Sequence, residues 1–185
     1  IEYNGNSIDG SGGPGTYGNH VPMVGVDFFK GPHKYIHQPD GTIKVSLLSM
    51  QAFTYFNNDN GNYGNPTNGI EIYNYMTGSD RKGEIFNNDF KGPGIISTAT
   101  TAGPKTRFVF FGDPDQSTWS ECTCGNPVGD RRFIHSAGAF QLIPGAVNDL
   151  IIGSCWVADV GGCPNTSFKK IRAADDVIQS LFDAG

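Results

Sequence analysis

Apolar side chains recur along most of this chain in short runs, several of which alternate with polar residues. Successive side chains of a strand point to opposite faces of a sheet, so a period of two predicts strands. The first apolar run covers residues 21–29 and ends at the turn formers of residues 30–32. Further strands are predicted over residues 42–56, 105–111 and 131–137.

Two further segments cannot be assigned from the period of two alone. Residues 68–77 allow a strand or a short helix, and we favour the helix because apolar side chains from Ile70 to Met76 can share one side and Gly78 ends it. Residues 139–142 and 148–157 flank Pro144-Gly145, a strong turn signal, and therefore predict a hairpin-like pair.

The pattern changes to a helical period at the C-terminal end of the sequence. Asn165, Thr166 or Ser167 can cap the predicted helix, because their side-chain oxygens accept from free backbone N–H groups. Its apolar face must be covered, since exposed it would form a large hydrophobic patch. That face comprises Phe168, Ile171, Ala174, Ile178, Leu181 and Phe182.

These patterns predict a mainly β fold, an antiparallel β-sandwich with long loops and a C-terminal amphipathic helix. The 26 Gly and 11 Pro supply turns, and the 13 Phe and 7 Tyr supply core side chains. Trp156 lies in an apolar strand and is expected in the core. Residues 1–20 are rich in Gly, Asn and Ser and are interpreted as an arm or linker, and residues 21–185 as a single β-rich domain. Because the chain starts at Ile1, we expect a fragment of a larger protein.

Charge and hydropathy exclude several classes of partner. The net charge is -5 and no basic stripe is visible, which argues against nucleic acid. No apolar run approaches the length of a membrane-spanning helix, so no membrane span is expected.

Four cysteines favour disulfides and an oxidising compartment. We expect Cys122 or Cys124 to pair with Cys155 or Cys163. A bond between Cys122 and Cys124 is disfavoured, because two side chains that are two residues apart on a strand point the same way across too long a span. Free thiols in a core remain an alternative. Zinc is a weaker one, because the spacings do not match zinc knuckles.

No catalytic motif is recognisable, but three residues are candidates for ligand binding. Trp119 lies in a polar loop, where its ring could stack on a sugar or fold back over the edge of the sheets. Arg131 and Arg132 offer rigid donor groups for a carboxylate or a sugar. The alternative is a structural role, with an arginine satisfying loop carbonyls and nearby aspartates.

Calcium is the one cofactor that the sequence suggests. Asp59, Asp113 and Asp115 lie in loops rich in Asn and Asp, which offer hard oxygen ligands. None of these loops fits the twelve-residue calcium motif, and Asn and Asp also simply suit turns.

Several stretches together resemble a module of large exported proteins of Bacteroidota. The most specific are GDRRF-x-x-SAG-x-F-x-L-x-PGAVND at residues 129–149 and AADD-x-x-Q-x-LFD at residues 173–183. Proteins with this module typically carry a sorting signal of the type IX secretion system. The resemblance implies a secreted or cell-surface location and supplies no catalytic residues. Similar proteins have small or apolar residues at the four cysteine positions, which implies that disulfides are a local addition here.

Two functions are consistent with these observations. The first is a non-catalytic structural or interaction module of a secreted or cell-surface protein, such as an adhesin, a filament or an outer-membrane assembly. Its partners would be other domains of a larger parent protein or of a surface assembly. The alternative is an accessory or glycan-binding domain of a secreted hydrolase, with glycans as partners.

Overall fold

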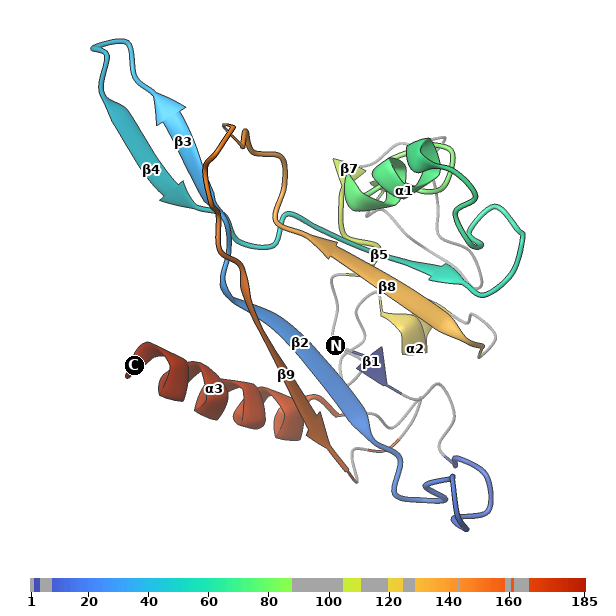
Figure 1. The fold of residues 1–185 in the computed structure, drawn as a ribbon. Coiled ribbons are helices and arrows are strands. Elements are labelled where there is room, and N and C mark those ends of the chain that lie inside the picture. Colours follow the sequence, from blue (N-terminus) through green and yellow to red (C-terminus); the bar gives the residue numbers. More distant parts are fainter. Residues whose placement is uncertain are drawn as a thin grey trace.

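Antiparallel strands make up most of the regular structure (Figure 1). The computed structural model describes residues 2–3, 8–87, 105–110, 120–124, 129–142, 144–158, 161 and 167–185. Within them the sheets have the orders β1-β2-β9, β3-β4, β5-β8 and β6-β7. The predicted β-rich fold is confirmed, and the sandwich stays a prediction. The elements are β1 (Glu2–Tyr3), β2 (Met23–Lys30), β3 (His33–His37), β4 (Ile43–Leu47), β5 (Ala52–Asn57), α1 (Gly69–Met76), β6 (Phe86–Asn87), β7 (Lys105–Thr106), α2 (Glu121–Cys124), β8 (Arg131–Ser136), β9 (Ile151–Val157) and α3 (Lys169–Asp183).

The ladder between β2 and β9 joins segments that are far apart in the sequence. Met23 pairs with Val157 at one end and Lys30 with Ile151 at the other, with a register shift after Phe28. Strand β1 pairs with the other edge of β2. Because opposite residues of an antiparallel pair share a face, one side of this sheet collects small and apolar side chains for the helix.

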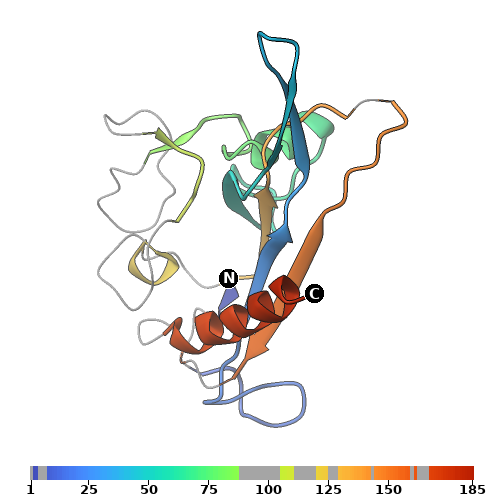
Figure 2. The same cartoon turned by 90° about the vertical axis from the view of Figure 1, so that its left-hand side faces the viewer.

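Helix α3 covers that side of the sheet and crosses β2 and β9 (Figure 2). Met23, Cys155, Phe168 and Ile171 form the buried core between helix and sheet. Gly25 allows this close approach, because a Cβ atom there would lie 2.8 Å from Cys155 Sγ and 3.2 Å from the Ile171 side chain. The predicted C-terminal helix is therefore present and packed.

The two ends of α3 differ in part from the sequence-based prediction. Phe168 occupies the cap position without a side-chain hydrogen bond, and Ser167, one of the three predicted caps, accepts from the Lys169 N–H through its Oγ at 3.4 Å. Asn165 and Thr166 lie outside the described residues. Leu181 was placed on the covered face but is 68% exposed, whereas Phe182 in the same turn contacts the sheet, its ring 5.5 Å from that of Phe29. None of the described helices combines the length and apolarity that a membrane crossing demands.

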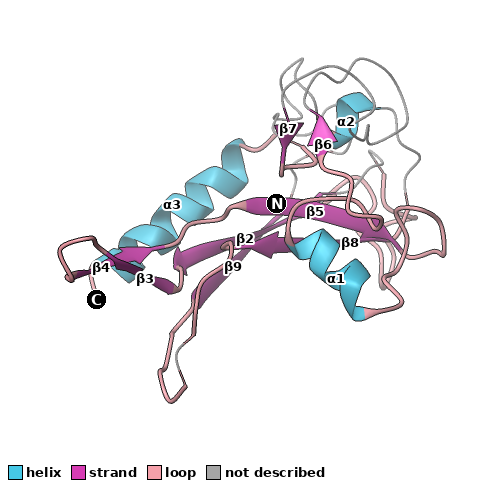
Figure 3. Ribbon diagram, turned by 90° about the horizontal axis from the view of Figure 1, so that it is seen from above, coloured by secondary structure: helices cyan, strands magenta, loops and turns pink. Residues whose placement is uncertain are grey.

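A second core lies against the β5–β8 sheet. It contains Tyr55, Phe86 and Val109, with Phe53 and Phe133 packed around them. Figure 3 shows α1 along this sheet and α3 along the β2–β9 sheet. The two sheets meet where the Phe28 ring lies 5.5 Å from the His135 ring, and burial lowers the pKa of His135.

The β3–β4 hairpin projects from the end of β2 (Figures 1 and 2). Its turn is fixed by Asp40, whose Oδ1 accepts from the Thr42 N–H at 2.9 Å and the Thr42 hydroxyl at 2.7 Å. Gly41 follows with φ of 83°, the left-handed conformation that such a turn requires. The sequence Pro39-Asp40-Gly41 favours this turn, because the Asp side chain accepts hydrogen bonds from its own loop and Gly adopts the left-handed conformation.

The side chain of Asn148 continues the β2–β9 ladder beyond its last backbone pair. Its Oδ1 accepts from the His33 N–H at 2.8 Å, and its Nδ2 donates to the His33 carbonyl at 2.8 Å. His33 lies three residues after Lys30, and Asn148 three residues before Ile151, so the contact keeps the register of the ladder. One side-chain amide therefore takes the place of a peptide group.

Three predicted strands differ in extent or pairing. Residues 42–56 form two strands, because the chain changes partner between them: Leu48 N–H bonds to Pro32, and Gln51 N–H bonds to Ser136. In residues 105–110 only β7 is a strand, and Phe108 makes a single bridge to Phe53. Residues 139–142 form no strand, and β9 pairs with β2 in place of the predicted hairpin partner.

The other outcomes are mixed. Strands β2 and β8 and helix α1 lie where they were predicted. Trp156 is 53% exposed and so is not a core residue, because it lies on the face of β9 away from α3. In the predicted arm, β1 joins the sheet and Asp9 and Gly18 exchange backbone hydrogen bonds of 2.8 and 2.6 Å, so residues 9–18 form a closed loop.

Replacing Asn148 with Ala removes both hydrogen bonds to His33, and we expect the free energy of unfolding to fall by about 1–2 kcal/mol. Urea denaturation measures the change. The matched control is Asp149→Ala, at the neighbouring exposed position. Equal losses in the two variants would contradict the role of the amide.

Replacing Asp175 with Asn should stabilise the protein at neutral pH. Burial, and then the charges of Asp27 and Asp176, raise the pKa of Asp175 above 3.8, so its ionised form is less favourable in the folded state. The penalty is present above the folded pKa and disappears as the pH falls through it. We expect Tm to rise by roughly 1–2 °C at pH 7 and the gain to vanish in acid. Scanning calorimetry with Asp149→Asn, at an exposed position outside α3, as control tests this; equal gains from both variants would contradict it.

Candidate functional site

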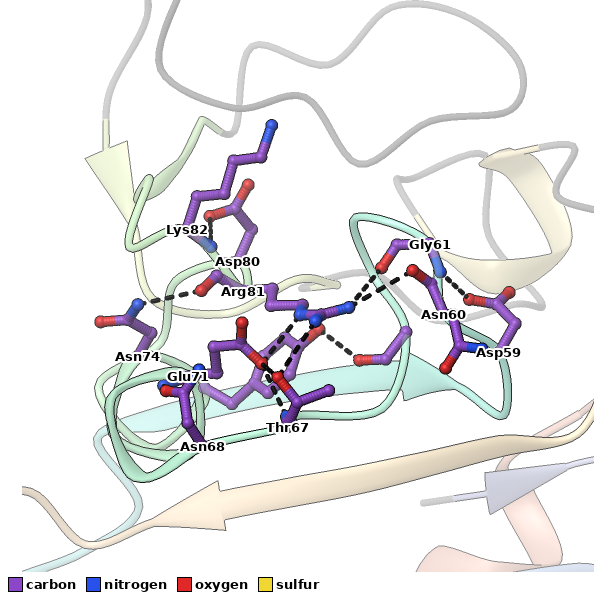
Figure 4. Close-up of polar contacts among 12 residues, drawn as sticks. Asp59, Asn60, Gly61, Thr67, Asn68, Glu71, Asn74, Asp80, Arg81 and Lys82 are labelled. Atoms are coloured by element: carbon purple, nitrogen blue, oxygen red, sulfur yellow. Dashed lines mark hydrogen bonds and ion pairs between the residues drawn. The ribbon is translucent and has the colours of Figure 1, made fainter.

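A polar cluster surrounds Arg81, between helix α1 and the loop that follows β5 (Figure 4). The Arg81 Nε lies 2.9 Å from Glu71 Oε2. One terminal nitrogen of the guanidinium donates to the carbonyls of Gly61, at 3.1 Å, and Asn60, at 3.4 Å. A single side chain therefore connects the helix to the loop.

The start of α1 places Glu71 for this contact. Asn68 caps the helix, its Oδ1 accepting from the Glu71 N–H at 3.1 Å. In return, Glu71 Oε2 accepts from the Thr67 N–H at 2.6 Å and from the Thr67 hydroxyl at 3.0 Å. This is a capping box in which the glutamate reaches one residue before the cap. The Thr67 N–H and the Arg81 guanidinium lower the pKa of Glu71 to about 2.

The turn after α1 fixes Arg81 from the other side. Asp80 is buried, and its Oδ1 accepts from the N–H groups of Lys82 and Glu84, each at 2.9 Å. Asn74 Nδ2 donates to the Arg81 carbonyl at 3.0 Å. These bonds hold the backbone of the turn, so the Arg81 side chain projects toward Glu71 (Figure 4).

Tyr75 anchors α1 to the sheet beneath the cluster. It is 1% exposed, and its ring stacks on Phe56 with centroids 5.2 Å apart. Its hydroxyl donates to the Gly64 carbonyl at 2.8 Å, and the Thr54 hydroxyl donates to the Tyr75 carbonyl at 3.2 Å. Burial raises the pKa of Tyr75, so this donor stays protonated across the physiological range.

The cluster borders an open hollow of about 580 Å³. Among the described residues, the side chains of Asn60 and Asn62 and the Lys82 ammonium make no hydrogen bond. Ile70 is 75% exposed at the same place. The hollow thus offers polar groups without hydrogen bonds beside an apolar surface, and the contacts of Arg81 and Tyr75 hold the elements that line it in place. Its lining residues are Asn60, Gly61, Asn62, Asn68, Ile70, Glu71, Asn74, Arg81 and Lys82.

The predicted ligand-binding arginines lie elsewhere, at the start of β8. A terminal nitrogen of Arg131 lies 2.9 Å from Glu121 Oε1, and its guanidinium lies over the Tyr55 ring at 5.1 Å. Arg132 donates to Asn65 Oδ1 at 3.0 Å. These internal contacts fit the structural alternative, and ligand binding by the two arginines stays a prediction. Trp119 lies outside the described residues.

The described calcium candidate has a local role in its loop. Asp59 Oδ1 accepts from the Gly61 N–H at 2.7 Å, which closes a turn. Asp113 and Asp115 lie outside the described residues. Within the described ranges, no three His, Cys, Asp or Glu side chains gather in a way that could hold a metal ion.

The cysteines differ from the predicted pairing at one position. Cys155 is a free, buried thiol in the core under α3, where burial raises its pKa, so its predicted disulfide is wrong. Its place against Gly25 and Ile171 leaves it packed as a small apolar side chain. Cys122, in α2, is disulfide-bonded. Cys163 and the Cys124 side chain lie outside the described part of the chain.

Sequence reasoning did not find the Arg81 cluster. The available signal was the spacing Asn68-x-x-Glu71, which marks a capping box before an apolar run. Arg81 itself carries no local signal, because its partners come from a loop twenty residues earlier in the chain. No family model, no curated protein and no solved structure matches this chain.

Replacing Glu71 with Gln should destabilise the protein in a pH-dependent manner. The folded-state pKa is lowered from 4.5 to about 2, so the stabilisation is complete above pH 4.5 and is lost as the pH falls toward 2. We expect a lower Tm than wild type at pH 7, and a difference that shrinks in acid. Thermal denaturation from neutral to acidic pH measures it. The control is Glu84→Gln, an exposed neighbour, and a pH-independent difference would contradict the ion pair.

Proposed function

We propose that this chain is a non-catalytic interaction module of a secreted or cell-surface bacterial protein. Its β3–β4 hairpin would receive an extended segment from another domain of the same parent protein. The carrying observation is a row of exposed apolar side chains on one face of that hairpin, which also carries His33 and His37. The resemblance of residues 129–149 and 173–183 to exported proteins of Bacteroidota supports the surface location.

The apolar face follows β4 with a period of two. Ile43 is 56% exposed, Val45 50% and Leu47 57%. On β3, Tyr35 lies directly opposite Val45 and is 41% exposed. Cross-strand partners share a face, so these four side chains form one continuous strip. Contiguous exposed apolar surface of this kind is typical of interaction sites.

The free edge of β4 also supports strand addition. Gln38 N–H donates to Thr42 O at one end of the hairpin, and Leu48 N–H donates to Pro32 O at the other. Hydrogen-bonded and non-bonded pairs alternate in an antiparallel ladder, so the peptide groups of Ile43 and Val45 point away from β3. Among the described residues, β4 pairs only with β3. An extended segment could therefore hydrogen-bond to this edge.

Charge defines the chemistry of the partner segment. The opposite face of the hairpin carries Lys34 and Lys44, although the whole chain has a net charge of -5. A complementary strand would place apolar side chains beside Val45 and acidic side chains beside the two lysines.

We also propose that the β1-β2-β9 and β5-β8 sheets are the two layers of a sandwich. The contact between Phe28 and His135 supports this arrangement.

Amide hydrogen exchange of the isolated chain and of the parent protein tests the strand addition. In the isolated chain, we expect the Ile43 and Val45 amides to exchange rapidly and the Lys44 amide slowly. In the parent protein, the first two should become protected, because the added strand accepts their hydrogen bonds. Val45→Glu should abolish this protection.

The matched control is Val147→Glu, the same substitution at a valine that is 82% exposed outside the hairpin. It should leave the protection unchanged. No added protection in the parent protein would overturn the proposal. Concentration-dependent association of the isolated chain that Val45→Glu removes would also overturn it, because the occupant would then be a second copy.

A further inference from the structure

The geometry points to a second binding site, for a neutral saccharide, in the hollow between α1 and residues 60–62. It goes beyond the proposed docking of a strand, since none of its lining residues belongs to the β3–β4 hairpin. The residues that carry it are not among the sugar-binding candidates that the sequence suggests.

The unused hydrogen-bonding groups of the hollow are mostly amides. Asn60 and Asn62 each present a carbonyl oxygen and an NH₂ group that bond to no described residue. Asn68 and Asn74 also line the hollow, each with one described bond on one side of its amide. An amide offers a donor and an acceptor side by side. Adjacent sugar hydroxyls need this arrangement, because each hydroxyl both donates and accepts.

The charges of the hollow are compensated except for Lys82, which favours a neutral ligand. The Arg81 guanidinium is paired with Glu71 and also donates to two loop carbonyls. Lys82 carries the remaining positive charge of the lining, and the buried carboxylate of Asp80 lies in the same turn. An anion would contact one exposed lysine, and a cation would contact one carboxylate that already has an arginine partner. Neither arrangement offers the several charged groups that would bind an ion tightly.

Shape and rigidity agree with a sugar rather than an ion. The hollow of about 580 Å³ falls within the usual range of small-molecule sites. Ile70, 75% exposed, offers an apolar surface for the C–H face of a ring. The Arg81 contacts and the Tyr75 anchor hold the loop and α1 in place before a ligand arrives, which lowers the entropic cost of binding.

Nuclear magnetic resonance titration of the whole chain tests the site with five trisaccharides as probes. Four are neutral, made of α-glucose, β-glucose, xylose or N-acetylglucosamine units, and the fifth is anionic trigalacturonate. We expect at least one neutral probe to shift the amide signals of residues 60–62, 68–74 and 81–82 in a saturable manner. We expect a dissociation constant of roughly 1 mM, because an open hollow leaves much of the sugar surface in water.

The double variant Asn60→Ala with Asn62→Ala should weaken binding of that probe by roughly tenfold, since several hydrogen bonds are lost, and leave Tm unchanged. Asn19→Ala, at an exposed position outside the hollow, is the matched control and should bind as wild type. Val45→Glu should also bind normally, which separates this site from the hairpin. No saturable shift with any neutral probe, binding of trigalacturonate alone, or binding that the double variant retains would overturn the proposal.

Discussion

The antiparallel ladder between β2 and β9 is the constraint on which the other contacts depend. It joins residues 23–30 to residues 151–157, so the chain between β2 and β9 must start and end at the same end of this ladder. The small residue Gly25 on its helix side lets α3 approach until Ile171 is almost fully buried. Its other side meets the β5–β8 sheet through Phe28. The ladder therefore positions the core under α3 directly and contacts the β5–β8 sheet, which carries the second core.

The two proposed binding regions lie in different parts of the chain between β2 and β9. The hairpin leaves the ladder at His33, where the Asn148 amide completes the last bond. The hollow lies between α1 and the loop after β5, which Arg81 connects. Each region is fixed at its base by polar contacts and presents unpaired groups at its surface. This division allows a protein segment and a small ligand to be bound without competing for the same residues.

The sequence predicted the elements whose signals are local. The turn of residues 30–32 ends β2, the apolar spacing defines α3, and Gly78 follows the end of α1. It did not predict where a strand changes partner. Residues 42–56 keep a period of two while the chain passes from β3 to β8, and a period reports which side chains alternate, not which strand lies opposite.

The candidate site was missed for the same reason. Glu71 and Asn68 interact within one helical turn and carry a recognisable spacing, but Arg81 reaches back to the carbonyls of residues 60 and 61. The exposure of Trp156 also depends on a non-local fact, namely which face of β9 the helix covers. Composition placed an apolar residue in an apolar strand but could not say which side of that strand would be buried.

The polarity of the β2–β9 ladder has a mechanical consequence. The chain enters β2 at Met23 and leaves β9 at Val157, and these two residues are paired at the same end of the sheet. Tension applied along the polypeptide would therefore open the hydrogen bonds one after another, as in unzipping, rather than shear them all together. Met23 and Val157 both belong to the core under α3. Under load, the packing of that helix, and not the ladder itself, would be the first barrier to unfolding.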